Sequence, residues 1–149
     1  MRAAVLVLLA SVMIACGPKS STLDELNSRV VTLPGGRQVQ AEVVATPQEM
    51  ARGLMYRSSI APDRGMLFIH ERPGYNSYWM YHCIISLDLI WMDGDHRIVE
   101  LVPNAPPCKT EETSQCPNYG GHEQSRFVLE LGGGMAAKYG LKLGDRLDF

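Results

Sequence analysis

The sequence predicts a mostly β domain: a compact β-sandwich of jelly-roll type or a small barrel, with two short helices. Three observations support this fold class. Short apolar runs rich in β-branched residues recur along residues 29–149, turn residues such as Asp93-Gly94 separate them, and only two stretches carry helix signals. Many short strands with brief helices are typical of sandwiches and small barrels. A chain of 149 residues has room for one such domain.

The first predicted elements are the two strands of a hairpin. Residues 29–33 and 37–45 are strand-like runs on either side of a Pro-Gly-Gly turn at 34–36. Apolar and polar residues alternate in the second run, which predicts a strand with one buried face.

Helix signals occur in two places. Thr46, Pro47 and Glu49 have the order of a capping box with proline in the first turn, and this helix is expected to end near Tyr56. The second helix is expected at 135–139, where Gly140 ends it.

The remaining strands are predicted from apolar runs bounded by turn residues. A polar loop at 103–125 separates the fourth of these runs from the fifth. The predicted strands cover residues 65–69, 78–80, 87–92, 96–102, 126–131 and 146–149.

The N-terminal residues predict export and lipidation. Arg2 precedes an uncharged apolar run that fits the core of a secretory signal and is too short to span a bilayer comfortably. The run ends in Met13-Ile14-Ala15-Cys16, which resembles a lipobox, the motif whose cysteine receives a diacylglyceryl group. An ordinary signal peptide that ends by chance at a cysteine is the alternative.

This interpretation divides the chain into three parts. We expect a lipoprotein signal peptide at 1–15, a flexible tether at 16–28 that begins with the lipidated Cys16, and a single β-rich domain at 29–149. Gly17 follows the cysteine, and aspartate at this position retains lipoproteins of enteric type in the inner membrane. The resemblance therefore implies a cell-envelope protein anchored in the inner leaflet of the outer membrane, on the periplasmic side.

The charge of the chain argues against one class of partner. The formal net charge is −2, and removal of the signal peptide leaves 13 basic residues against 16 acidic ones. A weakly acidic domain has no electrostatic basis for binding nucleic acid. The expected partners are the membrane, through the N-terminal lipid, and a small polar ligand or an envelope protein.

Several short motifs follow one another along about residues 41–149. They are Gly53-Leu54-Met55-Tyr56-Arg57, Gly65-Met66-Leu67-Phe68, Trp79-Met80, Leu87-Asp88, Tyr119, Val128-Leu129-Glu130-Leu131 and Leu143-Gly144-Asp145. Their order resembles the domain of unknown function 192 family. The resemblance implies a compact, mostly β fold of jelly-roll or barrel type, and it implies no reaction.

The chain departs from the pattern of this family between residues 81 and 86. Where the family usually reads Trp-Met-Lys-Asn-Thr, this sequence reads Trp79-Met80-Tyr81-His82-Cys83, and Ser86 stands where a proline is common. If the lysine and asparagine form a family site, that site is altered here.

Three cysteines remain besides Cys16. Export places them in an oxidising compartment, and we expect Cys108 and Cys116 to form a disulfide that pins the polar loop. Cys83 is then a buried, inert thiol, while its pairing with either loop cysteine is the rival arrangement.

A zinc site is not predicted, and no other cofactor is expected. The candidate ligands His82, Cys83, Cys108, Cys116 and His122 lack the close spacings of zinc sites. Adjacent His82 and Cys83 would also point to opposite faces of a strand.

The candidate ligand cleft combines Asp88 with three rings. Asp88 lies inside an apolar run, where a carboxylate must be paired or exposed, and Arg64 or Arg126 are its structural alternatives as partners. Trp79, His82 and Tyr119 would complete a cleft for a sugar or a small polar ligand.

These residues favour a tethered binding or interaction module over an enzyme, because no catalytic constellation is evident. Two other functions remain open. One is an envelope hydrolase that uses Asp88 with His82 or Cys83, and the other is a purely structural lipoprotein that docks on a membrane partner.

Overall fold

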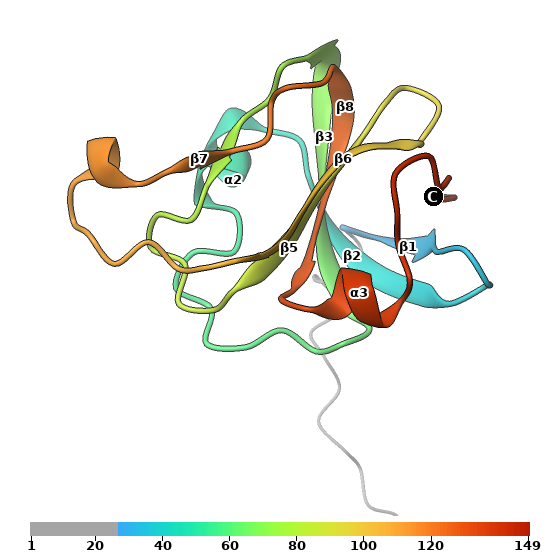
Figure 1. Ribbon diagram of the computed structural model, residues 1–149, viewed down its shortest axis with the longest axis horizontal. Helices are drawn as coiled ribbons and strands as arrows, with labels where there is room; N and C mark the ends of the chain where they lie inside the picture. The colour runs from blue at the N-terminus through green and yellow to red at the C-terminus, as the bar shows by residue number, and fades with distance from the viewer. Residues whose placement is uncertain (1–26) are drawn as a thin grey trace, which may run out of the picture.

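The computed structural model describes residues 27–149, which form a six-stranded sheet, a separate two-stranded sheet and two short α-helices (Figure 1). The predicted mostly β class with two short helices is confirmed. The signal peptide, Cys16 and all of the proposed tether up to residue 26 lie outside the described residues. None of the helices formed by residues 27–149 is long and apolar enough to cross a membrane.

The large sheet is mixed and has the strand order β1-β2-β3-β8-β5-β6. Its strands β2 and β3 are parallel, and the other neighbouring pairs are antiparallel. The small sheet pairs β4 with β7 in antiparallel fashion. The strands are β1 Ser28–Thr32, β2 Gln38–Val44, β3 Arg64–Gly74, β4 Tyr78–Trp79, β5 Leu87–Met92, β6 Ile98–Ala105, β7 Asn118–Tyr119 and β8 Ser125–Gly132.

The predicted closing strand at 146–149 is present only as two isolated bridges. Thr32 in β1 pairs with Asp148, and Arg97 before β6 pairs with Arg146. The C-terminal segment thus lies between the two edge strands of the sheet. The ladder of residues 27–149 nevertheless stays open, so the sheet is not a closed barrel.

Helix α2 (Pro47–Arg52) begins with the predicted capping box: the Thr46 hydroxyl accepts from the Glu49 N–H, and the Glu49 carboxylate accepts from the Thr46 N–H. The helix ends earlier than expected, because Gly53 adopts a positive φ of 45° and its N–H donates to the Glu49 carbonyl. A Cβ at Gly53 would lie 3.3 Å from the Phe68 ring, so the chain approaches β3 closely here.

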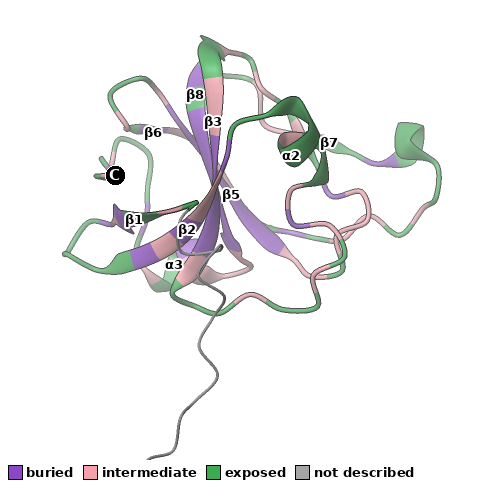
Figure 2. Ribbon diagram, turned by 180° about the vertical axis from the view of Figure 1, so that it is seen from behind, coloured by how far each residue is buried: buried purple, intermediate pink, exposed green. Residues whose placement is uncertain are grey.

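The sheet buries a core on each of its two faces, and Figure 2 shows the central strands buried over most of their length. We call them the α3 face and the α2 face. Helix α3 (Met135–Lys138) and the C-terminal segment cover the α3 face, where Ala136 and Leu147 pack against the sheet. Helix α2, the residues after it and the small sheet cover the α2 face, where Leu54 and Met80 are buried.

The region expected to be one long loop at 103–125 is partly ordered into β structure. Strand β6 continues to Ala105, and β7 forms at Asn118–Tyr119. The predicted disulfide between Cys108 and Cys116 is present between these strands, and Cys83 is a free thiol. A 3-10 turn at Thr113–Gln115 lies inside the ring that the disulfide closes.

Candidate ligand-binding cavity

Asp88 has a structural role that its sequence context did not reveal. The residue is completely buried, and its carboxylate accepts hydrogen bonds from the N–H groups of Asn104, Gly134 and Ala136, at 2.6, 2.9 and 2.5 Å. These bonds tie the end of β6 and the start of α3 to β5. Backbone amides therefore take the place of Arg64 and Arg126, the partners considered from the sequence.

The residues of the expected cleft are consequently divided between the two faces of the sheet. Asp88 pairs in register with Leu131, which belongs to the core of the α3 face. Tyr119 packs on the α2 face instead. Since side chains alternate along a strand, Asp88 points away from the side on which the rings gather. Asp88, Trp79, His82 and Tyr119 do not form one cleft, which corrects that expectation.

Four rings on the α2 face contact one another in series, and two of them line a different site. The centroid of the His82 ring lies 4.9 Å from that of Tyr56 and 3.8 Å from that of Tyr81, and the Tyr81 and Trp79 rings are 5.5 Å apart. Trp79 is 40% exposed and Tyr56 is 62% exposed. Trp79 and Tyr81 also line a cavity, whereas His82 and Tyr119 do not.

This cavity lies on the α2 face and has a volume of about 240 Å³. Four parts of the chain enclose it: α2 and the turn after it, β3, the segment from Ser77 to Cys83, and one residue of β8. Apolar and aromatic side chains predominate in the lining. The lining residues are Met50, Ala51, Arg52, Gly53, Leu54, Met55, Phe68, His70, Ser77, Tyr78, Trp79, Tyr81, Cys83 and Glu130.

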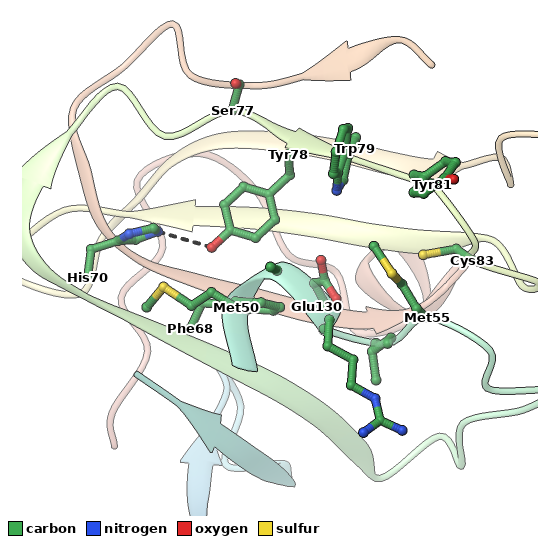
Figure 3. Close-up of a pocket in the computed structure, with 14 residues that line it drawn as sticks. Met50, Met55, Phe68, His70, Ser77, Tyr78, Trp79, Tyr81, Cys83 and Glu130 are labelled. Atoms are coloured by element: carbon green, nitrogen blue, oxygen red, sulfur yellow. Dashed lines mark hydrogen bonds between the residues drawn. The ribbon is translucent and has the colours of Figure 1, made fainter. Parts of the chain in front are cut away.

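Glu130 is the buried acid of this cavity. Its backbone lies in the middle of the large sheet, where β8 pairs it with Met66 of β3 and Leu89 of β5. The neighbouring Leu129 and Leu131 belong to the α3 face, so the alternation of the strand turns Glu130 to the α2 face. Figure 3 shows its carboxyl group pointing into the space between Phe68, Tyr78 and Met55.

The Glu130 carboxyl group has neither a hydrogen bond nor an ion pair with any residue in 27–149, although the residue is only 5% exposed. No polar side-chain atom that is fully sealed within these residues lacks a partner. Because the Glu130 oxygens have no partner among these residues, they must retain a small solvent-accessible area. This area faces the cavity that Glu130 lines.

Burial raises the pKa of Glu130 to about 8. Removal from water disfavours the charged form. Within residues 27–149, no hydrogen bond or ion pair of Glu130 offsets this effect. At neutral pH this carboxyl group is therefore mostly protonated.

Three further titratable groups of the cavity, His70, Tyr78 and Cys83, are also held in their neutral forms. The Tyr78 hydroxyl and His70 Nε2 share a hydrogen bond of 3.0 Å. Burial lowers the pKa of His70, and burial together with the charge of Glu130 raises the pKa of Tyr78. Burial and, secondarily, Glu130 raise the pKa of the Cys83 thiol to about 12.

This electrostatic setting does not supply what the hydrolase alternative needs. A thiol nucleophile reacts as the thiolate, which is scarce at neutral pH when the pKa of Cys83 is so high. Asp88, the expected acid, is on the opposite face and is already bonded to three N–H groups.

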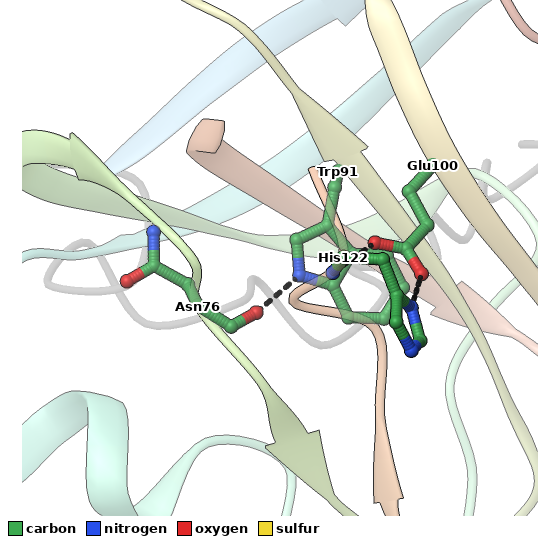
Figure 4. A network of polar contacts seen from close by, with 4 residues as sticks. All are labelled: Asn76, Trp91, Glu100 and His122. Carbon is green, nitrogen blue, oxygen red and sulfur yellow. Dashed lines mark hydrogen bonds and ion pairs between the residues drawn. The ribbon is translucent and has the colours of Figure 1, made fainter. Parts of the chain in front are cut away.

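Trp91 fixes the position of the small sheet. Its ring is buried near the end of β5, and its Nε1–H donates to the Asn76 carbonyl at 2.7 Å, just before β4 (Figure 4). Gly120, the residue that follows β7, packs on the same ring with a φ of 66°. A Cβ at this position would lie 2.2 Å from Trp91 Cζ2. Trp91 thus contacts the segments next to both strands of the small sheet, β4 and β7. The Tyr78 ring packs edge-on against the Trp91 ring.

The potential zinc ligands are not gathered at this site. Across residues 27–149, no three His, Cys, Asp or Glu side chains are close enough to hold a metal ion. Cys108 and Cys116 are joined in the disulfide, and His122 pairs with Glu100 on β6 instead.

Sequence reasoning missed Glu130, although a signal was present. Asp88 stands out in the sequence as an acid inside an apolar run. Glu130 satisfies the same criterion, because it follows Phe127, Val128 and Leu129 and precedes Leu131. Applied evenly, the criterion would have selected both acids, though it could not have told which one lacks a partner.

Comparisons with known proteins agree with this fold. A protein of unknown function from Novosphingobium aromaticivorans DSM 12444 is similar in structure, with a TM-score of 0.74 and 29% identity over 91% of this chain and 94% of the other. A protein from Sinorhizobium meliloti 1021, named as a candidate transcription regulator, has a TM-score of 0.70 and 30% identity over 80% of this chain and 89% of the other.

No curated protein sequence matches the chain significantly. The model of one family, described as "Uncharacterized ACR", matches residues 30–149. This match agrees with the resemblance of the motifs and covers nearly all of the β domain. The chain therefore belongs to the domain of unknown function 192 (DUF192) family.

Proposed function

We propose that this protein is a lipid-anchored binding module of the cell envelope, and that its ligand occupies the cavity around Glu130. The observation that carries the proposal is a carboxyl group that is 5% exposed, lacks a partner within residues 27–149 and faces an apolar cavity. Ligand sites typically combine apolar walls with a few convergent polar groups.

The energetics of Glu130 favour a role in binding over a role in stability. An unpaired polar group in an apolar setting costs roughly 1–3 kcal/mol in mutational data, and a charged group costs more. A bound ligand that pairs with the carboxyl group would recover this cost. The volume of about 240 Å³ limits the ligand to a small molecule, about the size of a single substituted ring.

The cavity can be tested with a variant that obstructs it. Ala51 lies on α2, lines the cavity and is exposed, so Ala51→Trp should block ligand entry without disturbing the core. Gln48→Trp, on the same helix outside the lining, is the matched control. Small amines, envelope sugars and peptidoglycan fragments would be screened by thermal shift against the wild-type protein and both variants.

We expect compounds that raise the melting temperature of the wild type and of Gln48→Trp, but not of Ala51→Trp. Compounds that stabilise all three proteins equally would place the ligand elsewhere and refute the proposed site. A screen without any stabilising compound would favour the remaining candidate, a structural lipoprotein that docks on a membrane partner.

The anchor is proposed from the sequence, through the lipobox-like residues that end at Cys16. Mass spectrometry of the exported protein should find an N-terminal diacylglyceryl cysteine at position 16, and Cys16→Ser should release the protein from membranes. On a density gradient we expect the wild type with the outer membrane. Recovery with the inner membrane alone would contradict the proposed location, and an unmodified N-terminus would contradict the anchor.

The description of the Sinorhizobium relative does not lead to a proposal for this chain. A net charge of −2 gives no electrostatic attraction to nucleic acid. The binding proposal instead follows from the Glu130 carboxyl group, which is buried and has no partner within residues 27–149.

A further inference from the structure

We propose that the cavity selects a small organic cation, whose ammonium group pairs with the Glu130 carboxylate while its apolar body contacts the surrounding rings. This inference rests on the proposed function and specifies the chemical class of the ligand.

The charges around Glu130 favour a cationic ligand. Of the described residues that line the cavity, Glu130 is the only acid, and no cation in residues 27–149 forms an ion pair with it. His70 on β3 is bonded to Tyr78 and is neutral, and the Cys83 thiol is neutral as well. Arg52 on α2 is exposed, and its guanidinium makes no ion pair with Glu130.

The walls of the cavity also suit an organic cation. Phe68 and Tyr78 meet edge to face, with ring centroids 5.0 Å apart, and Trp79 and Tyr81 line the cavity beside them. The faces of aromatic rings attract cations, and the attraction is stronger where water is excluded. The polarisable thioethers of Met50 and Met55 complete an apolar lining that suits the hydrocarbon part of an amine.

Other ligand classes fit these residues less well. An anion would be repelled by the ionised form of Glu130, and a metal ion would find no cluster of three donors among residues 27–149. A sugar needs several hydrogen-bonding partners, whereas the Tyr78 hydroxyl is already bonded to His70 and few polar groups remain. An ammonium group requires only the acid and the rings that are present.

Binding of a cation should expel the proton from Glu130. Because burial raises the pKa of this carboxyl to about 8, affinity for a cation should increase about tenfold per pH unit below that value and then level off. Of the groups facing Glu130, His70 is already neutral through the upper part of this range, and Tyr78 and Cys83 stay neutral throughout. The pH dependence therefore reports on Glu130.

The experiment compares two probes of nearly equal shape, benzylammonium and benzyl alcohol. Their dissociation constants would be measured by calorimetry or NMR titration at pH 6, 7 and 8 on the purified chain. The variants are Glu130→Gln, which removes the charge with little change in shape, and Glu100→Gln, which removes an acid outside the cavity. A third variant, Arg52→Gln, removes the positive charge at the mouth.

We expect benzylammonium to bind the wild type and Glu100→Gln with affinity that rises with pH. Glu130→Gln should weaken it at least tenfold at pH 8, and Arg52→Gln should strengthen it about twofold to threefold at low salt. Affinity for benzyl alcohol should differ little between Glu130→Gln and the wild type.

Two results would overturn the cation inference. Equal affinity for both probes, unchanged in Glu130→Gln, would leave the cavity as a ligand site without selectivity for cations. Binding of benzylammonium that Ala51→Trp leaves intact would place it outside the cavity and contradict the proposed function as well. A melting curve for each variant separates loss of binding from loss of folding.

Discussion

Asp88 and Glu130 are buried acids on neighbouring strands of one sheet, and their surroundings differ completely. On the α3 face, three backbone N–H groups donate to the Asp88 carboxylate. On the α2 face, Glu130 meets aromatic rings and thioethers and has no partner within residues 27–149. Their strands are adjacent, with Asp88 opposite Leu131 and Leu89 opposite Glu130.

The difference separates an acid that stabilises the fold from one available for binding. A carboxylate that accepts three hydrogen bonds is satisfied by the protein and holds α3 and β6 in place. An unpaired acid weakens the fold whenever it ionises, so its presence in a cavity points to a partner from outside.

The largest effect is expected from Asp88→Asn. The asparagine amide has one oxygen, so it cannot accept at the positions of both carboxylate oxygens. Its NH2 group would face a backbone N–H that donates to the carboxylate in the wild type. We expect a loss of about 3 kcal/mol or more in the free energy of unfolding, because charge-assisted hydrogen bonds contribute about 1.5–3 kcal/mol each. Urea denaturation at pH 7 measures the change. A loss below about 1 kcal/mol would mean that Asp88 is not the anchor described here.

Glu130→Gln, the same chemical change on the other face, should have the opposite sign. Burial raises the pKa of Glu130 from 4.5 to about 8 in the folded protein. The folded state therefore holds a proton that the unfolded state has lost between these values. The contribution of Glu130 to stability is fully present below pH 4.5 and is lost as pH rises through about 8.

The wild type should accordingly lose up to about 1.4 kcal/mol per pH unit within this window through Glu130 alone, and Glu130→Gln should not. We expect the variant to be more stable than the wild type by a few kcal/mol at pH 9 and by much less at pH 5. Urea denaturation across this range provides the measurement. Parallel pH profiles for the two proteins would show that Glu130 is paired in solution.

Removal of the disulfide should affect only the α2 face. The bridge joins residues eight positions apart, and loop-entropy estimates give about 2–3 kcal/mol for rings of this size. The Cys108 N–H donates to the Met80 carbonyl, which links the ring to the end of the small sheet.

In the double variant Cys108→Ser/Cys116→Ser, we expect faster hydrogen exchange in β4 and β7, a lower melting temperature and easier proteolysis near Lys109. Exchange in β1 and α3 should stay unchanged. Equal loosening of both faces would show that the two cores are not independent, and a Cys83-containing disulfide in the exported wild type would contradict the pairing itself.

The smallest effect is expected at the pair of Glu100 and the exposed His122. The Nδ1–H of His122 donates to Glu100 at 2.6 Å, and this bond and the nearby charge raise the pKa of His122. Its contribution to stability is present below the ordinary value of 6.5 and disappears as pH rises through the raised value. Glu100→Gln should lower the pKa of His122 in an NMR titration and barely change the melting temperature. A large change in stability would mean that the pair supports the small sheet beside the cavity.

Several local features could be predicted from the sequence because they depend on neighbours in the chain. The capping box at Thr46 and Glu49 is one, and the hairpin of β1 and β2 is another. The pairing of Cys108 with Cys116 was predictable because their separation is short and the compartment is expected to be oxidising.

The tertiary structure alone decided which acid is satisfied and which is not. Asp88 and Glu130 look alike in the sequence, since each stands in an apolar strand. The Asp88 carboxylate finds its three donors at positions 104, 134 and 136, far along the chain, whereas Glu130 faces side chains of α2, β3 and β4 that bring no donor within reach. Strand register and the covering of each face arise from contacts distant in sequence, and those contacts determine which buried charge remains unpaired.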